Sequence, residues 1–374
     1  MSLTQTIANA LSQIGGDVVA PPMLLRAKVP LELSGEAVRN RICTFIDQDG
    51  REWALRPDLT LVIAQAEIDA RRCGLNGETI RRYNGPVFRL PSVPGAPVEF
   101  DQVGLEKFDA ASTVDQDAWL FETLTDASRS CGVDAGFVSF GDLSIFPTFV
   151  DALGMPDDVA AGLKRAFRQE GGVRAFLSGQ MRSRNGLSGR LSGMAQEDIA
   201  ALVEDIFAMT NVRPVGERRT DEIVERLFER AKSSDVTISA THKTAIEQIL
   251  SLNVSLESAP DALTKIAKDA GLSGFDEALQ NFTRRTELLL ASAHKTFLQT
   301  ARFATRFGRR FTYYDGFVFE VSATAATDAA SLPFMAGGRY DSLLRNLSGG
   351  EIDATAIGGI LVPHRLPVKT GAGS

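Results

Sequence analysis

The chain has 374 residues, of which 44% are hydrophobic, and a formal net charge of −7 with a pI near 5.2. This length accommodates one large domain with an insertion or two ordinary domains, and either arrangement buries a substantial core. The negative mean charge disfavours tight binding of nucleic acid unless a local basic face exists.

The cysteines and the N-terminus indicate a protein of the reducing cytoplasm. No two of Cys43, Cys73 and Cys131 have metal-ligand or redox-motif spacing, and their odd number argues against a disulfide framework. The first residues, MSLTQTIANALSQIGGDVV, lack the basic start and unbroken apolar stretch of an export signal, and no later run approaches a membrane span. We therefore expect no membrane contact.

Residues 36–140 have the pattern of a sheet with flanking helices. Short apolar runs at 42–46, 53–55 and 137–140 alternate with longer helical stretches and with Gly, Pro and Asp. From about residue 155 the pattern becomes helical.

The helical pattern continues to about residue 300. Apolar residues there recur at three- and four-residue steps, which lines one helix face; they are Phe275, Leu279, Phe282, Leu289 and Ala293. We predict a single, discontinuous α+β domain made of about 1–155 and 295–374, with a mainly helical insertion at 156–294.

The insertion contains an Arg-rich loop at about 181–194, with the sequence QMRSRNGLSGRLSG. Backbone amides and guanidinium groups in such a loop can cradle phosphate. The same composition is more often that of a mobile basic linker between helices. Both interpretations stay open for this loop.

After the insertion, FTYYDGFVFEV (311–321) returns to aromatic and β-branched residues. Asp315 and Gly316 supply turn chemistry inside this run, so the sequence predicts a hairpin at which the sheet resumes. A sheet built from both ends of the chain explains why the domain is discontinuous.

Familiar catalytic motifs are missing from the sequence. His242, His294 and His364 are too dispersed for a local metal site, and no HExxH, P-loop or nucleophile elbow is present. The pairs Gly337–Gly338 and Gly358–Gly359 do not form GxGxxG and are more often tight turns or close packing contacts than nucleotide sites. We expect neither a metal nor a cofactor.

Six segments nevertheless occur in an order that resembles one family over about 310 residues. They are LRPDLT (55–60), YNGPVFR (83–89), EFDQVGLE (99–106), RRFTYYDGFVFE (309–320), AGGRYDSLL (336–344) and AIGGILVPHRL (356–366). Together they resemble the catalytic core of histidyl-tRNA synthetase and of its non-catalytic paralogue, the regulatory subunit of ATP phosphoribosyltransferase.

The resemblance implies a class II aminoacyl-tRNA synthetase-like core, which is an antiparallel sheet flanked by helices. The segment VVAPPMLL (18–25) resembles the dimer-forming first motif of that core, so a homodimer is implied. A synthetase would continue into an anticodon-binding domain, whereas this sequence ends eight residues after Leu366. We therefore expect no anticodon-binding domain.

The resemblance also implies a pocket for histidine. By residue-by-residue carry-over, Asp58 meets the ammonium group with Thr60 and Gln102 as polar partners, and Glu106 accepts a hydrogen bond from an imidazole N–H. The other carried-over positions are Arg89 and Arg309 on the carboxylate side and Tyr313 and Tyr314 at the imidazole end. A zwitterion with a basic ring needs an anion, a cation and an acceptor desolvated together.

The departures from the synthetase pattern predict that aminoacylation is lost. After Arg89 the sequence reads LPSVPGAPVEF, with three prolines and no basic residue where a synthetase grips triphosphate. In the third motif Arg365 is present, but His364 stands in place of a glutamate and Val362 in place of a glycine. No residue of this chain is therefore expected to be catalytic.

These observations favour a regulatory subunit of ATP phosphoribosyltransferase, the first enzyme of histidine biosynthesis. In that family the subunit assembles with a short catalytic subunit, supports its activity and helps transmit feedback inhibition by histidine. Two alternatives stay open at this point: an active amino-acid ligase of the histidyl-tRNA synthetase type, and a stand-alone histidine sensor with another partner.

Overall fold

The computed structural model describes residues 1–34, 36–92, 95–109, 114–169, 171–178, 194–210, 224, 238–308, 313–324 and 332–368. It divides into two compact units. The first consists of 1–145, 250–265 and 276–374, and the second of 146–249 and 266–275. All the strands of the described residues lie in the first unit.

These units do not divide at the limits of the predicted insertion, 156–294. Residues 250–265 and 276–294 belong to the first unit, because β8 (Asn253–Ser255) joins its sheet and α15 (Asp276–Ala291) packs on α5 (Val114–Arg129).

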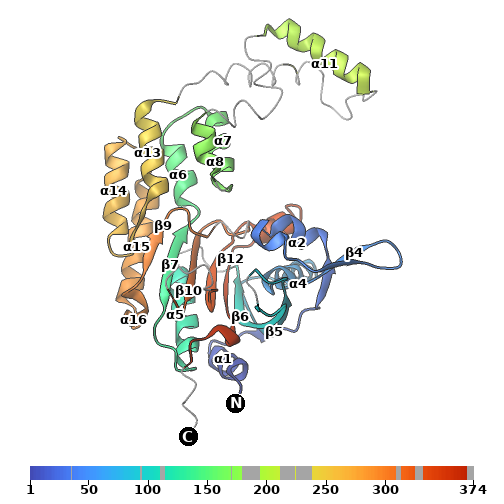
Figure 1. Ribbon diagram of the computed structural model, residues 1–374, viewed down its shortest axis with the longest axis vertical. Helices are drawn as coiled ribbons and strands as arrows, with labels where there is room; N and C mark the ends of the chain where they lie inside the picture. Colours follow the sequence, from blue (N-terminus) through green and yellow to red (C-terminus); the bar gives the residue numbers. More distant parts are fainter. Residues whose placement is uncertain are drawn as a thin grey trace. The chain divides into compact units, whose positions relative to one another are not determined.

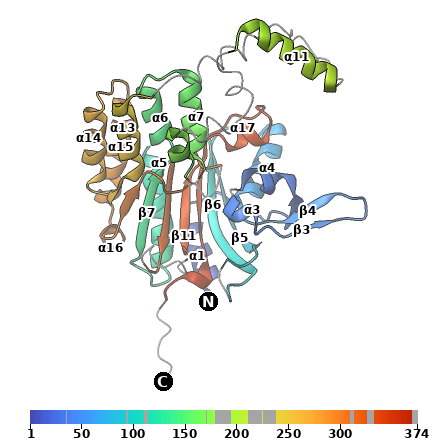
Figure 2. The same ribbon diagram turned by 45° about the horizontal axis from the view of Figure 1, so that its top comes forward.

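A large mixed sheet is the centre of the first unit (Figures 1 and 2). Its nine strands have the order β1-β5-β6-β12-β11-β10-β7-β9-β8. The bounds of the others are β1 Asp17–Val18, β5 Thr79–Phe88, β6 Glu99–Phe108, β12 Ala356–Leu361, β11 Met335–Arg339, β10 Phe317–Ser322, β7 Phe137–Asp142 and β9 Arg302–Ala304. Pairing is antiparallel from β5 through to β7, while β1 with β5 and β7 with β9 are parallel pairs. The predicted α+β class with an antiparallel sheet is confirmed.

Helices α1 (Leu3–Ser12) and α5 pack against each other on the large sheet. A Cβ atom on Gly359 would meet Leu124 of α5, whereas one on Gly358 would meet Glu106. Adjacent residues of a strand point to opposite faces. Glu106 therefore lies on the sheet face opposite α5.

This opposite face is kept open by small residues. In register across β6, β12, β11 and β10, one row holds Glu106, Gly358, Gly338 and Val318, and the next row holds Gly104, Ile360, Ala336 and Glu320. A Cβ on Gly338 would lie 2.9 Å from the ring of Tyr314, and one on Gly104 would lie 2.9 Å from the Tyr83 hydroxyl. The paired glycines of the sequence are thus close packing contacts in strands.

A small antiparallel sheet projects from the first unit in both ribbon views. It has the order β2-β4-β3, with β2 Leu24–Arg26, β4 Glu52–Leu55 and β3 Thr44–Ile46. The Asp47 carboxylate closes the β3–β4 turn, since it accepts from the backbone N–H groups of Asp49 and Arg51 and from Trp53 Nε1.

The remaining helices of the first unit surround these sheets. They are α2 Lys28–Leu33, α3 Glu36–Arg39, α4 Thr60–Arg72, α16 Lys295–Leu298, α17 Leu343–Leu347 and the 3-10 turn Pro363–Arg365. Helix α14 (Ala259–Asp269) contributes residues to both units.

Helix α15 contains three of the five periodic apolar residues, Leu279, Phe282 and Leu289, whereas Phe275 precedes it and Ala293 follows it. Phe282 and Leu289 are buried, and Arg285 is buried beside them. The Arg285 guanidinium forms ion pairs with Asp117 of α5, at 2.9 Å, and with Asp142 at the end of β7. This buried network ties the helix to the sheet.

The second unit is helical in its described residues. It contains α7 Asp157–Phe167, α8 Gly172–Leu177, α11 Gln196–Thr210 and most of α6 Ile145–Ala152 and α13 Ala240–Ser251. Phe146 and Phe167 stack at 4.4 Å, and Phe149 meets Phe275 edge-on at 5.6 Å. The Arg-rich loop at 181–194 lies outside the described residues apart from Met194.

The predicted hairpin at Asp315 and Gly316 is wrong. These residues precede β10, whose two neighbours in the sheet are β11 and β7, so neither edge of β10 is left for a strand across that turn. The Asp315 carboxylate instead accepts from the backbone N–H groups of Asp341 and Ser342. The turn-forming residues therefore anchor the start of β10 to the segment after β11.

Candidate functional site

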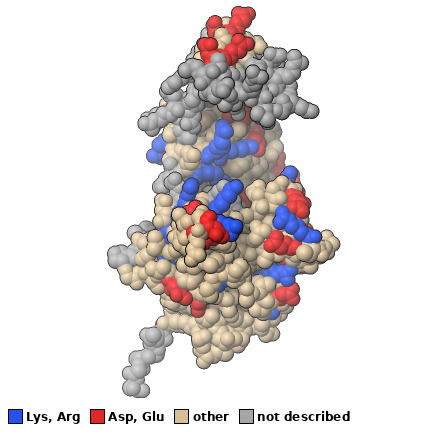
Figure 3. Space-filling model, turned by 90° about the vertical axis from the view of Figure 1, so that its right-hand side faces the viewer, with Lys and Arg blue, Asp and Glu red and all other residues tan. Residues whose placement is uncertain are grey.

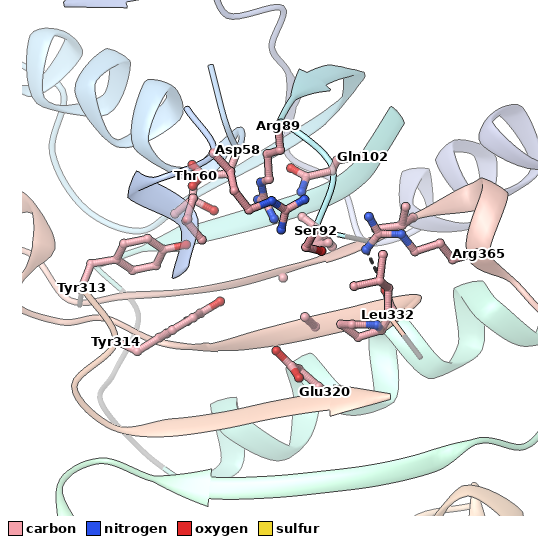
Figure 4. Close-up of a pocket in the computed structure, with 17 residues that line it drawn as sticks. Asp58, Thr60, Arg89, Ser92, Gln102, Tyr313, Tyr314, Glu320, Leu332 and Arg365 are labelled. Atoms are coloured by element: carbon pink, nitrogen blue, oxygen red, sulfur yellow. Dashed lines mark hydrogen bonds between the residues drawn. The ribbon is translucent and has the colours of Figure 1, made fainter. Parts of the chain in front are cut away.

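A pocket of about 380 Å³ opens on the glycine-rich face of the large sheet. Figure 4 shows side chains from the start of α4, from the segment after β5, from β6 and from β10 around it. Its lining residues are Val38, Arg41, Asp58, Thr60, Arg89, Ser92, Gln102, Tyr313, Tyr314, Glu320, Leu332, Pro333, Ala336, Gly359, Ile360, Val362 and Arg365.

Six of the eight residues predicted to bind histidine line this one pocket: Asp58, Thr60, Arg89, Gln102, Tyr313 and Tyr314. Of the other two, Arg309 lies outside the described residues. Glu106 is fully buried and is not among the lining residues. Its expected direct contact with an imidazole stays a prediction.

Asp58 brings a carboxylate to the pocket at the start of α4. Its Oδ1 accepts from the backbone N–H of Leu61 at 3.2 Å, as capping side chains do in a first helical turn. Its Oδ2 is buried and has no hydrogen-bond partner among the described residues. Burial raises the pKa of Asp58, and the nearby Arg89 guanidinium opposes that rise.

Two further acceptors face the same cavity. Gln102 Oε1 is buried without a partner in the described chain. Thr60 donates its hydroxyl proton to Glu106 Oε1 at 2.7 Å, so the oxygen keeps only lone pairs for a ligand. Buried acceptors left unpaired cost about 1–3 kcal/mol each, and a ligand with several N–H donors relieves that cost.

The Glu106 carboxylate lies behind the pocket and accepts hydrogen bonds from three hydroxyl groups. Its Oε1 accepts from Thr60 and from Tyr83, each at 2.7 Å, and its Oε2 accepts from Tyr340. Gly358 on β12 leaves the space for this carboxylate. Burial raises the pKa of Glu106 to about 8, although the hydrogen bonds from Thr60 and Tyr83 oppose the rise.

Three arginines line the pocket. Arg41 and Arg365 join Arg89, and Arg365 lies far from the tyrosines in Figure 4. Burial and then repulsion by Arg89 and Arg41 lower the pKa of Arg365 to about 10, while the Glu320 carboxylate acts in the opposite direction. The guanidinium groups remain cationic at neutral pH, so this part of the pocket is suited to an anionic group.

Sequence reasoning missed Arg41 and Glu320 as pocket residues. Arg41 is held by backbone pairing with Leu90, because Leu90 N–H donates to the Arg41 carbonyl at 2.8 Å and Arg41 Nε donates to the Leu90 carbonyl at 2.5 Å. Glu320 reaches the pocket through its register with Ala336. The alternation in FVFEV predicts a strand and could have indicated which face Glu320 occupies. No sequence pattern indicated that Arg41 lies in the pocket.

Tyrosine rings close the other end of the pocket. Tyr313 and Tyr314 lie 4.8 Å apart, and Tyr340 is 5.7 Å from Tyr313 and 5.9 Å from Tyr314. Burial raises the pKa of Tyr313 and of Tyr314, so both present neutral phenols at physiological pH. A flat aromatic ring fits this end by shape and chemistry.

Other kinds of site are not evident in the described part of the chain. It contains no group of three or more His, Cys, Asp or Glu side chains arranged to hold a metal ion. None of its helices combines the length and apolar character needed to cross a membrane. Lys and Arg share the surface with Asp and Glu in Figure 3, so the net negative charge is not uniform over this face.

Comparison with known proteins places this fold in a class. The sequence model of the family described as histidyl-tRNA synthetase matches residues 1–182 and 199–362. A solved histidyl-tRNA synthetase from Nostoc superposes with a TM-score of 0.58 at 15% identity, covering 97% of this chain and 69% of that one. The fold is a class II synthetase-like core, as predicted.

Curated relatives define the position within that class. The ATP phosphoribosyltransferase regulatory subunit of a Chelativorans species is 32% identical over 86% of this chain and 85% of its own length. The protein of the same name from Mesorhizobium japonicum is 32% identical over 88% and 86%. The chain belongs to the family of ATP phosphoribosyltransferase regulatory subunits.

A solved structure has a similar fold. The protein from Bacillus halodurans described as an ATP phosphoribosyltransferase regulatory subunit/histidyl-tRNA synthetase has a TM-score of 0.64 and 19% identity, covering 97% of this chain and 77% of that one. The names of the curated relatives support a regulatory, non-aminoacylating role.

Proposed function

We propose that this chain is the non-catalytic regulatory subunit that activates a short ATP phosphoribosyltransferase subunit and helps transmit feedback inhibition by histidine. The similarity to regulatory subunits over most of the chain supports the regulatory role. One observation supports histidine as the ligand. Asp58 Oδ2 and Gln102 Oε1 are buried acceptors with no partner among the described residues, and they face one cavity.

Histidine complements this cavity group by group. Its ammonium supplies N–H donors to Asp58, Gln102 and Thr60. Its carboxylate pairs with arginine, for which Arg89 is the described candidate and Arg309 the candidate outside the described residues. Its ring lies towards the tyrosines. Each charged group is thereby desolvated together with a partner, which is the condition for tight binding of a zwitterion.

The segment after Arg89 argues against adenylation by this chain. Arg89 N–H donates to the Val98 carbonyl at 2.8 Å, which closes a connection without charged residues between β5 and β6. His364 packs edge-on against Phe100 with ring centroids 5.6 Å apart. The segment after Arg89 supplies no further cation for the triphosphate, and the segment of His364 supplies Arg365 alone.

The first test is reconstitution. A short ATP phosphoribosyltransferase subunit is assayed for condensation of ATP with phosphoribosyl pyrophosphate, alone and with an excess of this chain, with and without histidine. We expect turnover to rise on addition of the chain and to fall again with histidine. A rate unchanged by the chain, although sizing shows a complex, would contradict the activator role.

The second test addresses the alternatives. Histidine-dependent exchange of pyrophosphate into ATP by the purified chain would indicate an active ligase. Histidine binding without any effect on a bound phosphoribosyltransferase would indicate a sensor with another partner. The regulatory proposal expects neither result.

We also propose that the chain acts as a homodimer in the cytoplasm, within a hetero-oligomer. Val18, Met23 and Leu24 of the first-motif segment are exposed by 70%, 50% and 42%. Exposed apolar side chains in one segment are typical of an interaction surface. Sedimentation of the chain and of a Met23→Asp variant tests this directly, because a charge in the interface is expected to shift the dimer towards monomer.

A further inference from the structure

Arg41 lines the pocket from the segment between α3 and β3, which none of the six family-like segments covers. Its side chain is half-buried and forms no ion pair with a carboxylate of the described residues. Burial and then repulsion by Arg89 lower the pKa of Arg41. The pocket wall therefore holds this cation beside a second cation, without a described counter-ion.

Contacts with Leu90 fix the place of this cation. Arg41 Nε donates to the Leu90 carbonyl at 2.5 Å, and Leu90 N–H donates to the Arg41 carbonyl at 2.8 Å. Leu90 directly follows Arg89, so the same contacts hold the two arginines in one wall of the pocket. Because Leu90 uses only Nε, the two terminal nitrogens of the Arg41 guanidinium are left to donate to a ligand.

The other two pocket arginines have carboxylates near them. The Asp58 carboxylate favours the cationic form of Arg89, and the Glu320 carboxylate favours that of Arg365. No carboxylate acts on Arg41 in this way among the described residues. An anionic group of a ligand therefore has the most to gain beside Arg41.

The connectivity of an amino acid brings its carboxylate to this wall. The α-ammonium and the α-carboxylate share one carbon atom, so a ligand whose ammonium meets Asp58 places its carboxylate close by. Asp58 acts electrostatically on Arg89, and Arg89 acts on Arg41. A carboxylate has two oxygens, and each can accept from one guanidinium group. Binding between the two cations also relieves their mutual repulsion.

We propose that Arg41 binds the carboxylate of the ligand together with Arg89, and that it makes the pocket prefer an α-amino acid to the corresponding amine. This inference rests on the proposed histidine pocket and adds a residue that determines its specificity. Relief of the repulsion also steadies the contacts of Arg41 with Leu90. A ligand with a carboxylate thus fixes this wall of the pocket, and a ligand without one does not.

The experiment compares two ligands by calorimetry on the full chain. Histamine has the ring and the ammonium group of histidine but no carboxylate. Arg41→Met should weaken histidine about fivefold, as expected for a partly exposed ion pair, and leave histamine unchanged. Arg365→Met is the matched control, because it removes a pocket cation that Glu320 already balances. It should change the ratio of the two affinities less.

Hydrogen exchange supplies an independent measurement. Leu90 N–H donates to the Arg41 carbonyl, so its exchange rate reports how firmly this wall is held. At equal saturation, histidine should slow exchange at Leu90 more than histamine does, and Arg41→Met should remove that difference. Thermal unfolding checks that the variant is folded. If it is not, Arg41→Lys keeps the charge without the planar fork and should reduce the preference for histidine in part.

The outcomes separate this inference from the proposed function. An unchanged histidine affinity in Arg41→Met, equal weakening of both ligands, or equal protection of Leu90 by both ligands would overturn the role of Arg41 and leave histidine as the ligand. A wild-type chain that binds no histidine would overturn the proposed ligand, and this inference with it.

Discussion

Replacing Asp58 by asparagine should separate ligand binding from folding. The substitution keeps the shape of the side chain and the oxygen that accepts from Leu61 N–H, but it removes the negative charge that faces the proposed ammonium group. A charge-assisted hydrogen bond is worth about 1.5–3 kcal/mol, which corresponds to roughly ten- to a hundred-fold in affinity. We therefore expect Asp58→Asn to weaken histidine by that factor.

Without histidine, the same substitution should leave the thermal stability of the protein unchanged or raise it. Burial raises the pKa of Asp58, which means that the ionised carboxylate is costly in the empty pocket. Thermal unfolding of Asp58→Asn without histidine should therefore occur at the same temperature as the wild type or higher. Histidine should stabilise the variant less than it stabilises the wild type.

Calorimetry and thermal unfolding on the same preparations check both halves of this prediction. Glu320→Gln is the matched control, because it neutralises a second carboxylate of the same pocket that lies close to Arg365. It should affect histidine binding less than Asp58→Asn does. A folded Asp58→Asn variant with wild-type affinity would refute the assignment of the ammonium site.

Three further predictions concern stability. Arg285→Met should destabilise the chain by about 3–5 kcal/mol in chemical denaturation, because it removes the cation that pairs with the buried Asp142 carboxylate and leaves the buried Asp117 carboxylate with Arg339 alone; a smaller loss would mean that water reaches them. The pKa of Glu106 is raised from 4.5 to about 8 in the folded chain, so its contribution to stability is fully present below pH 4.5 and is lost as pH rises through 8. The difference in unfolding free energy between wild type and Glu106→Gln should change in that window, and a constant difference would show that Glu106 titrates normally. Gly358→Ala should lower the melting temperature, because its Cβ would collide with the Glu106 carboxylate; an unchanged melting temperature would contradict the packing.

The class of fold could be predicted because its signals are carried by ordered segments of sequence. The same segments located Asp58, Thr60, Arg89 and Gln102, which the structure brings into one pocket. The position of Glu106 behind Thr60 could not be predicted, because a motif gives residue order and not depth. Side-chain depth depends on which neighbouring strand residues are glycine.

Other errors had local causes. Asp315 and Gly316 have the composition of a hairpin turn, but the register of β10 with both β11 and β7 overrides this local preference. Arg41 belongs to a short segment without periodicity, and its place in the pocket depends on pairing with Leu90, far along the chain. Tertiary pairing of this kind leaves no pattern in either segment alone.

The order of strands in the large sheet has a consequence for how the protein is made. The pair of β6 with β12 joins Glu106 to Gly358, so it cannot form until the ribosome has synthesised nearly the whole chain. Until then β6 has β5 on one side and an unsatisfied edge on the other. Long-range pairing of this kind folds slowly and exposes strand edges to aggregation. The pocket spans this pair, so it is completed late, and truncated chains that retain β5 and β6 are expected to depend on chaperones.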